Sequence, residues 1–113
     1  MQDMNVHDMI YFQMNHFITK TINQNSEITL SKLVEIASWV SAYTIRQRHL
    51  QNGSISEDEM QMVLGAVGNF GHENFPDAFT QEQFAEVSAK ALELLKTPTF
   101  DEDAPQYFGQ YYR

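Results

Sequence analysis

The chain has 113 residues, no cysteine and a formal net charge of −8 at pH 7. This length suits one domain, and it is enough to bury a single core without disulfides or metals. The absence of cysteine excludes disulfides, thiolate metal sites and thiol catalysis. The N-terminal stretch MQDMNVHDM has no Lys or Arg, and no apolar run reaches about 20 residues. We therefore expect no signal peptide and no membrane span, and we predict a cytoplasmic protein.

The charge is distributed unevenly along the chain. Residues 1–48 hold four acidic and four basic side chains, whereas residues 49–112 hold eleven acidic side chains against Lys90 and Lys96. No Lys or Arg occurs between positions 49 and 89. Such an acidic half repels nucleic acid and anionic membranes and attracts basic partners. The alternative is that the charge serves only to keep the protein soluble.

Apolar spacing predicts four helices, over about residues 4–23, 30–50, 57–69 and 81–96. No strand-like alternation persists for more than a few residues, and no solenoid repeat is present. The fold class is therefore all-α, a compact bundle of four main helices with a C-terminal aromatic and acidic extension packed on it. We expect one domain, with residues 1–96 as the bundle and residues 97–113 as the extension.

The first helix is apolar on more than one face. One side carries a broad stripe, into which His7 falls, and we interpret this histidine as part of the core. The opposite side carries Met9, Phe12 and His16. The helix therefore either lies centrally or presents a second face to a partner. The stripe consists of Met4, Val6, Ile10, Met14, Phe17, Ile18 and Ile22.

The second and third helices carry recognisable end signals. Trp39 falls at the edge of the core stripe of the second helix, near Glu35 and Arg46. Gly53 is expected to end this helix in the left-handed conformation. Three glycines loosen the end of the third helix, so we expect a loop over residues 71–79.

The stretch NGSISEDEM matches the second half of a calcium-binding EF-hand loop. Gly53 stands at loop position 6 and Glu59 at position 12. Arg48 and Leu50, however, stand at positions 1 and 3, where a hard cation needs charged oxygens. We predict no calcium binding here, and we keep a degenerate EF-hand-like module as one alternative.

The same stretch is better interpreted as a helix start. Ser56 followed by Glu59 is a capping box, in which each residue satisfies a free N–H group of the first turn. Thr80 and Gln83 repeat the pattern, and apolar pairs flank both boxes as hydrophobic staples.

No motif in the chain indicates catalysis. The four histidines lack the spacing of a helical metal site, and the glycines lack the strand and lysine of a phosphate-binding loop. Neither G-x-S-x-G nor HExxH is present. We predict that the protein is not an enzyme and that it needs neither metal nor cofactor.

The C-terminal extension is the strongest functional lead. We expect Pro98 to end the regular structure, and the last fifteen residues contain five aromatic residues and three consecutive acids. Two alternatives stay open for these rings: Phe100, Tyr107 and Phe108 fold back to plug the bundle, or the aromatic residues contact a partner. Both hold if some rings pack inward while Tyr111 and Tyr112 point outward. A Tyr-Tyr pair beside acidic residues resembles small helical immunity proteins that neutralise basic nuclease toxins, although two tyrosines are an analogy and not a family motif.

The sequence thus favours an acidic protein-binding inhibitor of a basic, nucleic-acid-acting enzyme, of the toxin-immunity, antitoxin or phage counter-defence type. It would occlude the cationic surface of that enzyme and bind no nucleic acid or membrane itself. A second possibility is a structural or adaptor module that forms a homodimer through its first helix. The residues expected to contact the partner are Glu57, Asp58, Glu59, Glu73, Asp77, Asp101, Glu102, Asp103, Tyr107, Tyr111 and Tyr112.

Overall fold

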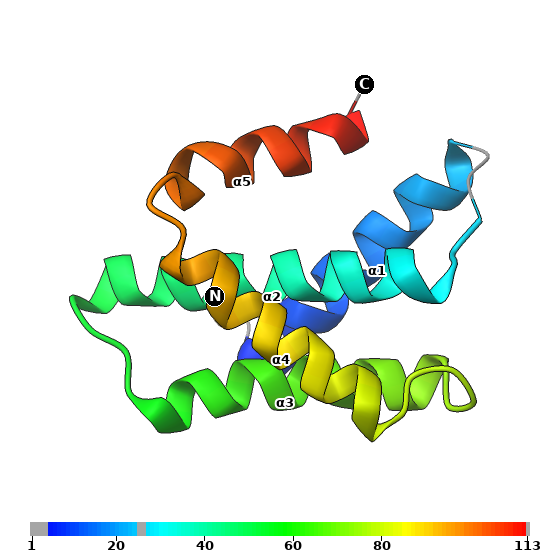
Figure 1. Cartoon of the computed structure of the whole chain (residues 1–113), viewed down its shortest axis with the longest axis horizontal. Helices are drawn as coiled ribbons and strands as arrows, with labels where there is room; N and C mark the ends of the chain where they lie inside the picture. Colours follow the sequence, from blue (N-terminus) through cyan, green and yellow to red (C-terminus); the bar gives the residue numbers. More distant parts are fainter. Residues whose placement is uncertain (1–4, 25–26, 113) are drawn as a thin grey trace.

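The computed structural model describes residues 5–24 and 27–112, and these residues form helices joined by short connections (Figure 1). The prediction of an all-α bundle of four main helices with a C-terminal extension packed on it is confirmed. None of the described helices is long and apolar enough to cross a membrane. The elements in chain order are α1 (Val6–Asn23), α2 (Leu30–Asn52), α3 (Glu57–Asn74), α4 (Gln81–Lys96), α5 (Phe100–Gly109) and the short 3-10 helix η1 (Gln110–Tyr112).

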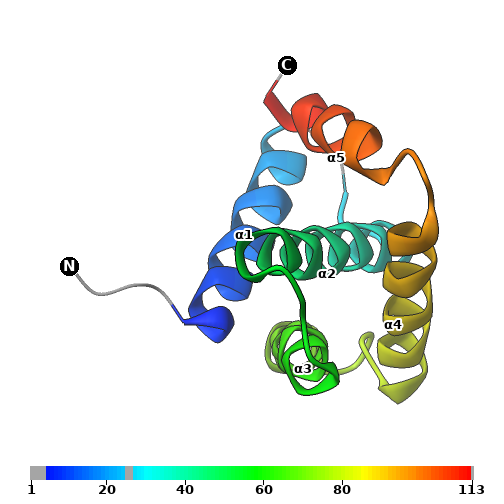
Figure 2. The ribbon, with the colours of Figure 1, turned by 90° about the vertical axis from the view of Figure 1, so that its left-hand side faces the viewer.

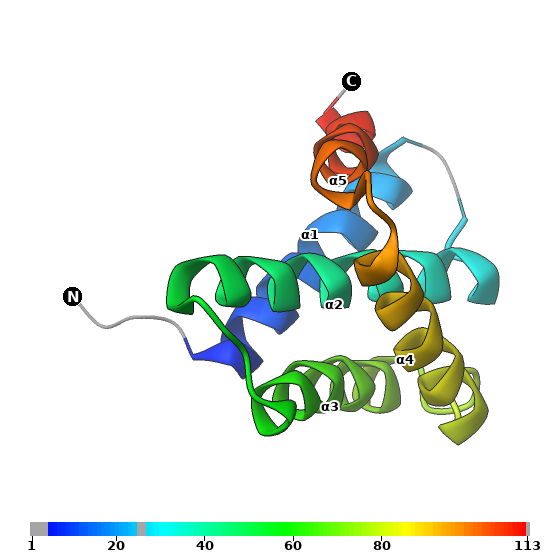
Figure 3. The same ribbon diagram turned by 60° about the vertical axis from the view of Figure 1, so that its left-hand side comes forward.

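Helix α2 holds the central position, and α1, α3 and α4 pack against it (Figures 1 and 2). Its buried residues include Ser38, Ser41, Ala42 and Thr44 as well as an apolar stripe. These small side chains let neighbouring helices approach closely on several sides of α2. The central helix is therefore the second one and not the first. Helix α4 leads from the level of α3 to that of α5 (Figure 3).

The buried face of α1 follows the predicted stripe from Val6 to Ile18, and it departs from that prediction at His7 and Ile22. The helix begins at Val6, because the side chain of Asn5 accepts a hydrogen bond from the Asp8 N–H at 2.8 Å. His7 is exposed and stacks on Tyr11 at 4.1 Å, so the interpretation of His7 as a core histidine is wrong.

At the C-terminal end of α1, one residue of the predicted stripe is exposed. Ile22, expected in the stripe, is 55% exposed. At this end α1 packs against η1, and Thr21 is buried beside the predicted Phe17 and Ile18. Met4, the first residue of the predicted helix, lies outside the described residues.

Helix α3 continues to Asn74, so the loop expected from residue 71 is wrong in its first part. Gly68 and Gly71 lie inside the helix, against the rings of Phe84 and Phe79. A Cβ atom at Gly68 would stand 2.6 Å from the Phe84 ring, and one at Gly71 would clash with the Phe79 ring. This close packing offsets the low helix propensity of glycine.

Regular structure does not end at Pro98, because α5 and η1 follow it. Helix α5 runs along α2 in the opposite direction, even though Pro105 lies inside it (Figure 1). Its first turn bonds to Arg46 near the end of α2, and Tyr107 bonds to Glu35 near the start of α2. Hydrogen bonds between α2 and both ends of α5 therefore hold α5 in place.

Candidate functional site

Two arginines in the last turns of α2 hold the starts of two other helices. The Arg46 guanidinium donates to both carboxylate oxygens of Asp101, at 2.8 and 2.7 Å. The Arg48 guanidinium donates twice to one oxygen of Glu59, each time at 3.3 Å. Asp101 lies in the first turn of α5 and Glu59 in the first turn of α3. The two ion pairs therefore bring two acidic helix starts to the same end of α2.

We call this region the acidic face, and Figure 2 views the molecule from this end. Among the described residues, two guanidinium groups, those of Arg46 and Arg48, form ion pairs with two of its six carboxylates. The side chains of Glu57, Asp58 and Glu102 are exposed and form no ion pair with any described residue. The face therefore keeps an excess of negative charge. Its carboxylates belong to Glu57, Asp58, Glu59, Asp101, Glu102 and Asp103.

The bonded carboxylates on this face are fixed in position. The hydrogen bonds and charge of Arg46 hold the pKa of Asp101 below its usual value, so this carboxylate stays ionised. Asp103 accepts a hydrogen bond from the Thr99 hydroxyl at 2.7 Å. Acids in the first turn of a helix are also stabilised by the partial positive charge of the helix N-terminus.

The EF-hand-like stretch has a structural role at this face. Gly53 ends α2 with a φ of 77°, as predicted, and the Ser56 hydroxyl accepts from the Glu59 N–H at 3.2 Å. The Glu59 side chain binds Arg48 and does not return to the cap, so only half of the predicted capping box forms. The residues at loop positions 1 and 12 are therefore bonded to each other. At Thr80, Gln83 does accept from the backbone N–H of the cap, at 3.2 Å.

Glu73 and Asp77 lie away from the acidic face. Glu73 is in the last turn of α3, and at about 1.5 Å per residue it stands roughly 24 Å along the helix from Glu57. With Glu82 these residues form a second group, which we call the acidic turn. Burial of the Tyr11 hydroxyl, together with the nearby charge of Glu73, raises the pKa of Tyr11 to about 12. The predicted contact residues thus fall into two separate regions.

Two of the predicted contact tyrosines, Tyr107 and Tyr111, pack inward. Tyr107 stacks on Trp39 at 4.5 Å, donates to Glu35 at 3.0 Å, and its hydroxyl lies 2.9 Å from that of Tyr111. Tyr111 is only 3% exposed, so of the two alternatives left open by the sequence its ring takes the inward one. The side chain of Tyr112 lies outside what the structure describes.

The face of α2 that receives α5 could have been found in the sequence. Glu35, Trp39, Tyr43 and Arg46 recur at helical spacing on one side of α2, and each contacts α5. An aromatic and charged stripe beside the core stripe indicates that a further segment covers it.

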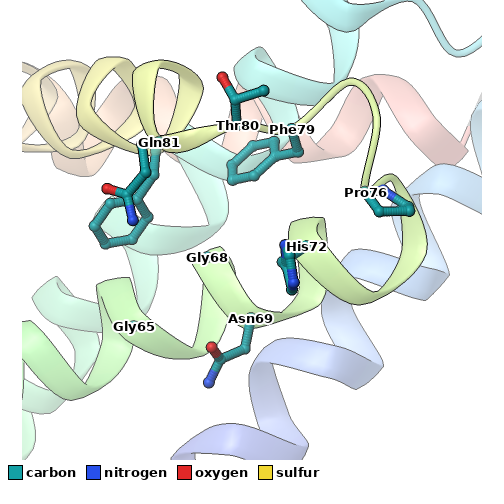
Figure 4. A pocket seen from close by; sticks show the side chains of 9 residues that line it. Gly65, Gly68, Asn69, His72, Pro76, Phe79, Thr80 and Gln81 are labelled. Carbon is teal, nitrogen blue, oxygen red and sulfur yellow. The ribbon is translucent and has the colours of Figure 1, made fainter.

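A cavity of about 510 Å³ lies between α3 and the start of α4 (Figure 4). The rings of Phe79 and Phe84 line the cavity and pack against the backbone of α3 at Gly71 and Gly68. His72 also lines the cavity, and none of the described lining residues is a carboxylate, a lysine or an arginine. Within the described part of the chain, no cluster of three or more His, Asp or Glu side chains could hold a metal ion.

A second cavity, of about 390 Å³, lies where α1, α2 and α5 meet. Of the three residues suggested for self-association, Phe12 and His16 line this cavity, and Met9 lines a neighbouring groove between α1 and α2. Phe12 is 62% exposed. The full lining is Phe12, Gln13, His16, Phe17, Tyr43, Pro105 and Phe108.

The geometry defines the protein as a small all-α domain with an acidic face built from two helix starts. Comparisons with protein-family models, with curated proteins and with solved structures found no match to the chain. Its function is therefore argued from its own residues.

Proposed function

We propose that the protein binds and inhibits a basic, nucleic-acid-acting enzyme by covering the cationic surface of that enzyme with the acidic face. The observation that carries the proposal is that Arg46 and Arg48 bond Asp101 and Glu59, which attaches the acidic starts of α5 and α3 to one end of α2. Toxin-immunity, antitoxin and phage counter-defence proteins are the kinds of inhibitor that fit, and we place the interaction in the cytoplasm.

The physical argument is competition with phosphate. Enzymes that act on nucleic acid present Lys and Arg side chains to the phosphate backbone, and these contacts supply much of their affinity. A rigid set of carboxylates offers the same cations an alternative partner. Glu57, Asp58 and Glu102 are exposed, and no described cation pairs with them, so they are available for such contacts.

Rigidity favours this face as a binding surface. The Arg46–Asp101 and Arg48–Glu59 pairs fix the starts of α5 and α3, so little conformational freedom is lost on binding. Charge complementarity of this kind accelerates association and selects against acidic partners. Tyr107 and Tyr111 act indirectly in this proposal, because they hold α5 on the bundle.

A pull-down from the native host at two salt concentrations tests the proposal. We expect the protein to capture a basic nucleic-acid-binding enzyme at low salt and to lose most of it at high salt, since exposed charge pairs are screened. The captured enzyme should lose activity when the protein is added in equimolar amount. Failure to capture any basic protein at low salt, or capture that is insensitive to salt, would contradict the proposal.

A further inference from the structure

A ridge of two rings on α1 suggests a second binding surface, separate from the acidic face. We propose that two copies of the chain associate through this ridge, which consists of Phe12 and His16. Each ridge would lie in a hollow of the other copy, in a dimer with twofold symmetry.

The ridge stands between two hollows on one side of the molecule. The rings of Phe12 and His16 are nearly parallel, at 10° and 6.3 Å between centroids. On one side of them lies the cavity of about 390 Å³ between α1, α2 and α5, and on the other a hollow of about 330 Å³ along α1. Both residues line both hollows. A ridge beside a hollow is self-complementary, which is what a twofold interface requires.

The larger hollow has a wall of rings that contact one another. His16 meets Phe17 edge to face at 5.1 Å, Phe17 meets Phe108 at 4.9 Å, and Phe108 meets Tyr43 at 5.2 Å. Phe17 is buried, and Tyr43 and Phe108 are partly buried, so packing fixes this wall. A ring from another molecule would extend an existing aromatic cluster, and aromatic pairs favour such tilted and edge-to-face contacts.

The charge distribution favours a second copy over a basic partner at this surface. Among the described residues that line the two hollows, Lys20 alone carries a formal charge, and none of these residues is a carboxylate. A basic partner would therefore find no countercharge here. Two copies that each carry −8 repel one another, and residues 1–48, which include all of α1, have no net charge. Contact through α1, which carries only Asp8 and Lys20 as formal charges, brings no net charge of that helix into the interface.

The size of the surface indicates a weak dimer. Helix α1 has 18 residues, and at about 1.5 Å per residue it is roughly 27 Å long. One face of such a helix with the edge of α5 falls short of the roughly 800 Å² per partner of a standard interface. We therefore expect a weak, reversible dimer.

Salt distinguishes this association from the proposed function. Salt screens the repulsion between two acidic copies, so it should strengthen the dimer. The same salt should weaken binding to a basic enzyme. The two proposals thus make opposite predictions for one variable, and either can fail without the other.

Sedimentation equilibrium on the full chain up to about 1 mM, at low and high salt, tests the dimer. Phe12→Ala should weaken association about tenfold, as truncation of a central aromatic anchor does. Ile22→Ala is the matched control, because Ile22 lies on the same helix and is 55% exposed but lines neither hollow. Both side chains are largely exposed, so both variants should fold.

The expected result is a dimer that strengthens with salt, weakens with Phe12→Ala and is unchanged by Ile22→Ala. A protein that stays monomeric at both salt concentrations would overturn the proposal. So would a dimer that weakens with salt, or one that Ile22→Ala weakens as much as Phe12→Ala does.

Discussion

The acidic face and the acidic turn carry similar residues in different settings. At the acidic face, Arg46 and Arg48 bond two of the carboxylates and join three helices. At the acidic turn, no arginine or lysine within residues 5–24 and 27–112 forms an ion pair with Glu73, Asp77 or Glu82. The turn is positioned instead by rings packed on the glycines of α3.

The two regions therefore differ in how their carboxylates are held. At the acidic face ion pairs fix two of the carboxylates in position, whereas at the acidic turn the carboxylates contribute only negative charge. The acidic turn adds to the net charge, which acts over a distance and is screened by salt. The acidic face adds fixed positions, because its two helix starts are tied to one rigid helix. The following experiments probe how each region is held, in order of decreasing expected effect.

The largest effect should come from removing the ring on which α5 rests. Trp39 stacks on Tyr107 at 4.5 Å and on Phe100 at 5.8 Å. Because Trp39 is only partly buried, we expect Trp39→Ala to lower the free energy of unfolding by about 2 to 3 kcal/mol. Urea unfolding measures this loss, and amide exchange should show faster opening in α5 than in α4. Equal acceleration in both helices would mean that α5 has no separate attachment.

The acidic turn should respond to a change that leaves the acidic face intact. A Cβ atom at Gly71 clashes with the Phe79 ring, which sets the path of the chain into α4. We expect Gly71→Ala to cost about 1 to 3 kcal/mol, the range for overpacking. Gly65→Ala is the control, because a Cβ atom there meets nothing within 4 Å. It should gain about 0.5 to 1 kcal/mol from higher helix propensity. Thermal unfolding compares the two variants. Equal changes in stability for Gly71→Ala and Gly65→Ala would show that the Phe79 ring does not pack on Gly71.

Alkaline pH should weaken the attachment of α5 by a smaller amount. Burial of Tyr107, and then its bonds to Tyr111 and Glu35, raise the pKa of its hydroxyl well above the usual value of 10.0. A group with a raised folded pKa contributes stability that is present below pH 10 and is lost as the pH rises further. We expect the wild type to lose about 1 kcal/mol more than Tyr107→Phe between pH 9 and pH 11. Urea unfolding measures both proteins. If the wild type and Tyr107→Phe lose the same free energy of unfolding, the Tyr107 hydroxyl is exposed to solvent and this explanation is contradicted.

The smallest effect concerns the ion pair at the surface. Hydrogen bonds from Arg46, and then its charge, lower the pKa of Asp101 below the ordinary 3.8. A lowered folded pKa contributes stability above pH 3.8 that is lost as the pH falls below it. Arg46→Gln should return the pKa of Asp101 toward its usual value, which carboxyl NMR titration would detect. Glu102 serves as the internal reference, since no cation pairs with it among the described residues. If the pKa of Asp101 does not change in Arg46→Gln, the ion pair is contradicted.

The helices could be predicted from the sequence where local signals agree with packing. Apolar spacing and the Ser56 and Thr80 caps place α3 and α4 correctly at their starts. Helix α5 was missed, since Pro98 was expected to end the regular structure and Pro105 disfavours an isolated helix. Its stability comes from rings packed on Trp39, which is a tertiary contact. The end of α3 was missed because it too depends on a tertiary contact, the packing of Gly68 and Gly71 against the rings of Phe84 and Phe79.

The candidate site could be predicted only in part. Its carboxylates are visible as an acidic run before a helix and another near the C-terminus. Their gathering depends on Arg46 meeting Asp101, 55 positions away, and on Arg48 diverting Glu59 from its cap. No local pattern encodes these contacts. The sequence also grouped Glu73 and Asp77 with the face, although the length of α3 separates them.

The most direct test of the acidic face compares two variants that lose the same charge. Glu57→Gln, Asp58→Asn and Glu102→Gln together neutralise the unpaired carboxylates of the face. Glu73→Gln, Asp77→Asn and Glu82→Gln together neutralise the acidic turn, and both triple variants change the net charge by three. Titration calorimetry with the captured basic enzyme measures both. We expect the first variant to bind about tenfold more weakly than the wild type and the second to change little, since exposed pairs contribute about 0.2 to 1 kcal/mol each. Equal weakening by the two variants would contradict a localised acidic site and leave only net charge as the source of binding.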